Sequence, residues 1–161
     1  MSTIRKYTMV FDGKLLRRGF WVYVWRIQSP KGVYLYIGRT GDSSSPYGAS
    51  PFTRVGRHLD VRQNAKSNTL ARHLLYAGLD PKRCRFRMVA LGPLFPEQRA
   101  MKAHRPLRDK VAALERGIAD FLRQRRYSVL GAHAGSLGPD ARLFATVQAL
   151  VAPEFPPRGN S

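Results

Sequence analysis

The chain of 161 residues contains one cysteine, Cys84, and only ten acidic residues. A single cysteine excludes an internal disulfide and a cysteine-based zinc site. No apolar run approaches the roughly 20 residues that a helix needs to cross a bilayer. The charges near the N-terminus are too scattered for a signal peptide. We therefore expect an intracellular, cytoplasmic protein without a membrane partner.

Several common chemical signatures are also missing. The chain has no glycine-rich phosphate loop, and no Ser-His-Asp arrangement can be argued from its spacing. His73, His104 and His133 are scattered, without the spacing of metal ligands. The sequence therefore gives no support to a phosphate-loop enzyme, a serine-triad hydrolase or a histidine zinc site.

What the chain has in excess is positive charge. It carries 28 basic residues against ten acidic ones, for a formal net charge of +18, and arginine outnumbers lysine 21 to 7. Arginine binds phosphate and guanine with two parallel hydrogen bonds, so a polyanion such as DNA or RNA is the expected partner. A membrane surface is not favoured, because no segment pairs a strong apolar face with a basic one.

The length and the hydrophobic fraction of 43% predict one packed domain. Residues 20–28 and 33–39 are rich in aromatic and β-branched residues and predict a β-hairpin. Because successive side chains of a strand point to opposite faces, Tyr23 and Tyr36 can lie on one side of this hairpin. We assign the aliphatic sides, Val22 with Val24 and Leu35 with Ile37, to the core.

The remaining segments complete an α+β fold. Residues 1–18 form a basic N-terminal arm, and residues 40–51 form a loop. We expect helices over 52–63, over 68–77 with Ser67 as N-cap, over 107–126 with Pro106 in the first turn, and from Asp140 to Val151, with a strand over 83–91. The predicted architecture is a small, mostly antiparallel three-stranded sheet flanked by helices, in the order β-β-α-α-β-α, plus a C-terminal helix.

Several short motifs lie on these predicted strands and helices in a defined order. Two tyrosine triplets, Trp21-Val22-Tyr23 and Tyr36-Ile37-Gly38, are followed by Arg54, by His58 one helical turn later, and by Glu115 on the long helix. In this order the motifs resemble the GIY-YIG nuclease superfamily over residues 19–128. Residues 129–161 would be a C-terminal extension. Each motif alone fits ordinary packing or a solvated helix face, so the resemblance depends on their joint order.

The resemblance implies a phosphodiester hydrolase. Glu115 would hold one Mg²⁺ or Mn²⁺, and Arg54 would neutralise charge on the phosphate. Either Tyr23 or His58 would be the general base, and Tyr36 would orient or relay the proton. The second triplet matches the family outright, whereas the first keeps only its tyrosine.

Further residues are expected to contact nucleic acid. By resemblance, Arg39 lies where a cation contacts the phosphate. Amides of the 40–51 loop can grip phosphate and Tyr47 can stack on a base. The basic face of the 83–91 strand either follows the nucleic-acid backbone or is a solvated edge. The expected nucleic-acid-binding set is Arg39, Thr40, Tyr47, Arg57, Arg83, Arg85 and Arg87.

At two positions, Gly38 and Ser128, the sequence predicts a structural role. Gly38 fits a strand bulge or a close backbone approach. The family often has an asparagine after the glutamate helix, and here that role falls to Ser128 or is absent.

The compact chain is most similar to a restriction-type endonuclease that acts on double-stranded DNA, with a homodimer able to cut both strands. The alternatives are a nonspecific or structure-specific nuclease, and a non-catalytic DNA- or RNA-binding module on the same fold.

Overall fold

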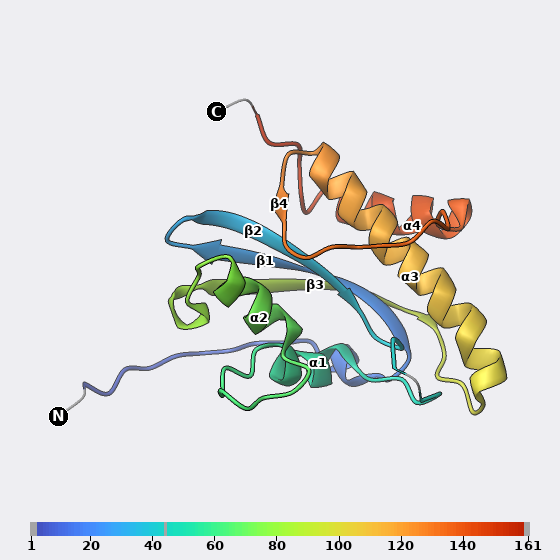
Figure 1. The fold of residues 1–161 in the computed structure, drawn as a ribbon, viewed down its shortest axis with the longest axis horizontal. Helices are drawn as coiled ribbons and strands as arrows, with labels where there is room; N and C mark the ends of the chain where they lie inside the picture. Colours follow the sequence, from blue (N-terminus) through green and yellow to red (C-terminus); the bar gives the residue numbers. More distant parts are fainter. Residues whose placement is uncertain (1–2, 44, 160–161) are drawn as a thin grey trace.

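A four-stranded sheet with helices on both faces forms the framework of the computed structural model, which describes residues 3–43 and 45–159 (Figure 1). Residues 1–2, 44 and 160–161, which belong to the expected arm, loop and extension, lie outside the described residues. The elements in chain order are η1 (Gly13–Leu16), β1 (Phe20–Ser29), β2 (Gly32–Arg39), α1 (Pro51–His58), α2 (Thr69–Tyr76), η2 (Pro81–Arg83), β3 (Arg85–Phe95), α3 (Met101–Gln124), β4 (Ser128–Val129) and α4 (Ala141–Val151).

The α+β class is confirmed, and the sheet contains one strand more than the sequence predicts. Its order is β3-β1-β2-β4, with β1 antiparallel to both neighbours. The additional strand β4 runs parallel to β2 and pairs Tyr34 with Ser128 and Leu35 with Val129. A two-residue strand is too short to show alternation, so no sequence pattern could indicate it.

The predicted hairpin is present, and its register places both motif tyrosines on one face. Tyr23 lies opposite Gly38 and Trp25 lies opposite Tyr36. On the other face, the aliphatic residues of both strands pack with α3 and α4 in one hydrophobic cluster. The tyrosine face is buried as well, because side chains of α1 and α2 cover it. The sheet therefore has a core on each side, and not on the aliphatic side alone.

Several helix boundaries differ from the predictions. α1 ends at His58 rather than near residue 63, and the Asn68 side chain bonds the Asp60 carbonyl oxygen at 2.8 Å, which ties down the segment that follows. Asn68, not Ser67, occupies the N-cap position of α2, since Ser67 has a φ of 61°. α3 begins at Met101, so Pro106 lies inside the helix.

The early start of α3 has a tertiary cause. His104 is fully buried and its ring lies 5.0 Å from that of Phe20, between ring centroids. Packing of this turn offsets the one helical hydrogen bond that Pro106 cannot donate. Within the described ranges, no helix combines the length and the apolar character that crossing a membrane requires.

The C-terminal segment contributes to the core. Val147, Val151 and Phe155 are buried in the cluster formed with α3. The Arg125 guanidinium donates to the carbonyl oxygens of Ala152 at 3.1 Å and Phe155 at 2.9 Å. Residues 141–155 are therefore integral to the packing of the sheet.

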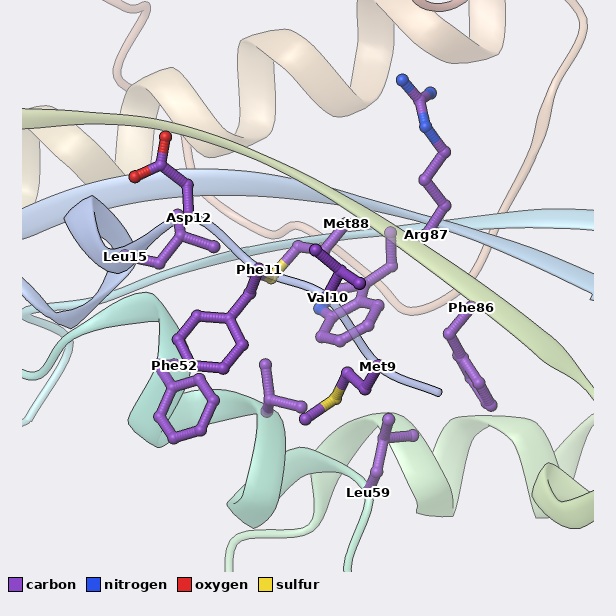
Figure 2. Close-up of a pocket in the computed structure, with 12 residues that line it drawn as sticks. Met9, Val10, Phe11, Asp12, Leu15, Phe52, Leu59, Phe86, Arg87 and Met88 are labelled. Atoms are coloured by element: carbon purple, nitrogen blue, oxygen red, sulfur yellow. The ribbon is translucent and has the colours of Figure 1, made fainter. Parts of the chain in front are cut away.

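The N-terminal arm borders an apolar groove between η1, α1 and β3. Figure 1 shows the arm extending away from the body. The groove has a volume of about 580 Å³, and Figure 2 shows Phe11 beside Phe52 within it, whereas Arg87 points away. None of the five predicted catalytic residues lines this groove.

Candidate active site

All five predicted catalytic residues line a single cavity of about 240 Å³. They come from four elements, because β1 supplies Tyr23, β2 supplies Tyr36, α1 supplies Arg54 and His58, and α3 supplies Glu115. The other lining residues are Gly38, Arg39, Asp42, Ser67 and Thr69. Residues that are distant in the chain therefore converge on one polar hollow of the fold.

Tyr23 and His58 form a hydrogen-bonded pair at the buried end of the site. The Tyr23 hydroxyl lies 2.8 Å from Nε2 of His58 and 3.3 Å from the carbonyl oxygen of Arg39. Burial raises the pKa of Tyr23, and the charges of Arg54 and Arg39 offset this only in part. Burial, reinforced by Arg54, lowers the pKa of His58 to about 4. At neutral pH the pair is therefore a phenol and a neutral imidazole.

Tyr36 also packs against His58, with 5.7 Å between the ring centroids. Burial raises the pKa of its phenol too. No hydrogen bond joins the Tyr36 hydroxyl to another of the described residues, although the hydroxyl belongs to a cavity-lining side chain. This phenol is therefore available to a ligand.

Gly38 has a steric role beneath Tyr23. A Cβ atom at this position would lie 2.5 Å from Cε2 of Tyr23 and 2.8 Å from its hydroxyl oxygen. Real Cβ contacts of that length do not occur, so a side chain here would displace the ring. Of the two roles predicted for Gly38, a strand bulge and a close approach to the backbone, the structure shows the close approach, made by the Tyr23 ring.

Two ion pairs cross the cavity. Arg39 Nη1 contacts Oε2 of Glu115, and Arg54 Nη2 contacts Oδ1 of Asp42. Nε of both arginines is buried without a hydrogen-bond partner, and so is Nδ1 of His58. Burial lowers the pKa of Arg39. Buried unpaired N–H groups are costly, so each arginine keeps hydrogen-bonding capacity that its carboxylate partner does not satisfy.

The residues present fit a hard divalent cation better than zinc. Glu115 presents a carboxylate whose side chain is 12% exposed, and Asp42 lines the same cavity with hydroxyl groups from Ser67 and Thr69. Among the described residues, no three His, Cys, Asp or Glu side chains are grouped as a metal site. One or two carboxylates with hydroxyl neighbours suit Mg²⁺, which keeps several of its waters.

Two residues near the charged groups were not predicted. Asp42 stands in the segment whose composition predicts only a loop. An acidic residue in a loop does not indicate a functional site until its partner, here Arg54, is known. His133 comes from the loop after β4, and its Nε2 lies 3.9 Å from Oε1 of Glu115, while Arg123 lies 3.1 Å from its Nδ1. Burial lowers the pKa of His133. Both residues reach the site only through contacts that are distant in the chain.

Ser128 does not stand beside Glu115. It is exposed, begins β4 and pairs with Tyr34, and it does not line the cavity. The residue after α3 that approaches the glutamate is His133. The expected structural role of Ser128 is therefore limited to the short parallel strand.

Thr40 is not available to nucleic acid. Its side chain is fully buried, and its hydroxyl accepts from the Trp21 amide at 2.9 Å and donates to the Gly19 carbonyl oxygen at 2.5 Å. Thr40 thus joins the end of β2 to the start of β1. Tyr47 and Arg57, in contrast, are exposed and line a second cavity of about 330 Å³.

The predicted basic strand face lies on the opposite side of the sheet from the cavity. Arg83 precedes the strand in η2, while Arg85 and Arg87 stand opposite Gln28 and Arg26 in β1. That register puts them on the face that α3 and α4 cover, and Arg87 pairs with Glu154 at 2.6 Å. Alternation predicted the spacing of these arginines, but the side they face depends on strand pairing.

The stability of the fold should decrease as the pH falls from about 6.5 to about 4. In this window the unfolded chain protonates His58 while the folded protein, with a pKa of about 4, does not. Above this pH window, the lowered pKa of His58 contributes its full value, about 3 kcal/mol, to the free energy of unfolding. Urea unfolding at a series of pH values should show this slope, and His58→Gln should reduce it by about one proton. An unchanged slope in that variant would contradict a buried neutral His58.

The cavity thus combines a phenol–imidazole pair, a second phenol, two arginines and a carboxylate. Asp42 and His133 lie beside its charged groups. No family model, curated protein or solved structure matches this chain.

Proposed function

We propose that the protein is a metal-dependent endonuclease of the GIY-YIG type that hydrolyses phosphodiester bonds in DNA. The observation that supports this most strongly is the convergence of Tyr23, Tyr36, Arg54, His58 and Glu115 on one cavity. The resemblance in motif order selected these five residues before the fold was known, and only tertiary packing brings the hairpin, α1 and α3 together around them. Their meeting, on a chain of net charge +18, is what a phosphodiesterase site requires.

The proton pathway begins at the Tyr23–His58 pair. A phenol whose pKa is raised is a poor base by itself, whereas a neutral imidazole can accept a proton at pH 7. We assign the 2.8 Å hydrogen bond to donation from the Tyr23 hydroxyl to Nε2 of His58. His58 then acts as the base, and Tyr23 passes to it the proton of the attacking water. Tyr36, whose hydroxyl is free, would orient that water or the phosphate.

The charged groups stabilise the phosphate. Arg39 and Arg54 are the cations of the cavity, and each has a buried Nε without a partner. Binding of a phosphate by the two guanidinium groups would balance the charge that develops in the transition state. Glu115 would hold Mg²⁺ or Mn²⁺, which when bound supplies polarisation of the phosphate and of the leaving oxygen.

A restriction-type enzyme that acts on double-stranded DNA as a homodimer is the finer proposal. The exposed loop beside the cavity supports it, because a loop is where such an enzyme would contact bases. The competing function is a non-catalytic DNA- or RNA-binding module. The two internal ion pairs favour that alternative, since Glu115 and Asp42 already occupy both arginines.

Plasmid cleavage separates the two functions. Supercoiled DNA incubated with the protein should be nicked or cut with Mg²⁺ and remain intact with EDTA. Glu115→Ala, purified in parallel, controls for contaminating nucleases, and Glu154→Ala is a matched change of a carboxylate outside the cavity. Discrete bands would support a restriction enzyme and a smear a nonspecific one. DNA binding without cutting, on any DNA or RNA offered, would overturn the nuclease proposal.

A further inference from the structure

A second polar cavity adjoins the candidate active site. It has a volume of about 330 Å³ and shares Arg54 with the first cavity. Its wall includes described residues of the segments 41–43 and 45–49, which are anchored at Gly41 and at Ala49. Gly41, with a φ of 80°, lies against the ring of Phe20, and Ala49 forms a β-bridge with Gly19. The hollow is therefore part of the fold before any ligand binds.

The lining of this cavity combines cations with one aromatic ring. Three of its residues are arginines and none is acidic, the full set being Arg18, Gly41, Ser43, Ser45, Tyr47, Gly48, Ala49, Thr53, Arg54 and Arg57. Arg18 is held by Glu97 through hydrogen bonds of 2.8 and 3.1 Å. Arg57 makes no ion pair with any carboxylate of the described residues. Tyr47 is 67% exposed, so its side chain is accessible to a ligand at the rim of this cavity.

A nucleotide matches both features of this lining. Its phosphate suits arginine and hydroxyl donors, and its base suits an exposed aromatic ring. A base inside continuous duplex has both faces covered by its neighbours, so only an unpaired base can stack on a tyrosine side chain. The shared Arg54 places this nucleotide next to the one whose phosphate enters the first cavity.

We propose that this cavity binds one unpaired nucleotide beside the scissile phosphate, with its base on Tyr47 and its phosphate on Arg57. The inference rests on the proposed nuclease function and specifies its substrate class. The favoured DNA is a duplex interrupted by an unpaired nucleotide at the position of cutting, so this inference selects the structure-specific form of the nuclease in place of the restriction-type form.

Fluorescence anisotropy in EDTA tests this proposal without cleavage. The probes are a labelled continuous duplex, the same duplex with one central unpaired nucleotide, and that duplex with the unpaired nucleotide made abasic. The wild-type protein should bind the second probe about tenfold more tightly than the other two. Tyr47→Ala should remove this advantage and Tyr47→Phe should keep it. Tyr76→Ala is the matched control, because Tyr76 is 96% exposed and lines neither cavity.

Three results would overturn the inference: equal affinity for the three probes, an advantage that survives Tyr47→Ala, or an advantage that survives loss of the base. If the protein cuts plasmid with Mg²⁺ but shows one of these results, the nuclease proposal stands and this subsite does not. If the protein neither binds nor cuts any probe, both proposals fail together.

Discussion

Tyr23→Phe should lower the rate of metal-dependent DNA cleavage by about 10²- to 10⁴-fold, the usual contribution of a positioned proton-transfer group. The change removes one oxygen atom and keeps the ring that packs over Gly38. It breaks the 2.8 Å hydrogen bond to His58, so the proton of the attacking water loses its route to the imidazole. Single-turnover cleavage of a labelled duplex with Mg²⁺ measures the effect on chemistry apart from product release.

The matched control is Tyr127→Phe. Tyr127 is also buried, and its hydroxyl donates to the Pro156 carbonyl oxygen at 2.9 Å, away from the cavity. Each variant loses one buried hydrogen bond, so both should lose about 1 kcal/mol of stability, but only Tyr23→Phe should lose cleavage. Equal cleavage by Tyr23→Phe and the wild type would mean that His58 needs no phenol, and the proton pathway proposed above would be wrong.

Gly38→Ala should destabilise the fold by about 1–3 kcal/mol, the typical cost of overpacking a buried site. The added methyl group would stand 2.5–2.8 Å from three atoms of the Tyr23 side chain, which lies opposite Gly38 in the hairpin. The ring must move, and the Tyr23 hydroxyl would then leave His58. Cleavage should therefore fall together with stability, by more than the lost fraction of folded protein explains.

Gly56→Ala provides the comparison for this prediction. Gly56 is an exposed residue of α1, and a Cβ atom there would meet nothing within 4 Å. The same substitution should stabilise this helix by about 0.5–1 kcal/mol. Urea unfolding of the two variants should thus give shifts of opposite sign. A Gly38→Ala protein as stable as the wild type would show that the Tyr23 ring can move aside freely.

The elements that the sequence predicted correctly are those that depend on residues close together in the chain. The hairpin, the shared face of Tyr23 and Tyr36, and the C-terminal helix after Asp140 follow from alternation, turn residues and a cap. The start of α3 could not be predicted, because burial of His104 against Phe20 extends the helix beyond Pro106. The strand β4 likewise exists only through its pairing with β2.

For the candidate site, too, the sequence predicted some features and the tertiary structure decided others. The resemblance of the motif order to the GIY-YIG superfamily singled out Tyr23, Tyr36, Arg54, His58 and Glu115, and a helical turn or a strand period fixes only the direction of each side chain on its own element. Their convergence on one cavity needed the packing of four elements. The sequence alone could not decide which groups neutralise the arginines.

The pairing of Arg39 with Glu115 and of Arg54 with Asp42 arises from the fold. So do the approach of His133 to Glu115 and the burial of Thr40. The same holds for the face of Arg85 and Arg87, which a one-residue change of register would reverse. Local periodicity therefore accounts for the elements, and the order of the motifs for the candidate residues. Burial and charge pairing depend on distances between distant segments, which exist only once the sheet and its helices have packed.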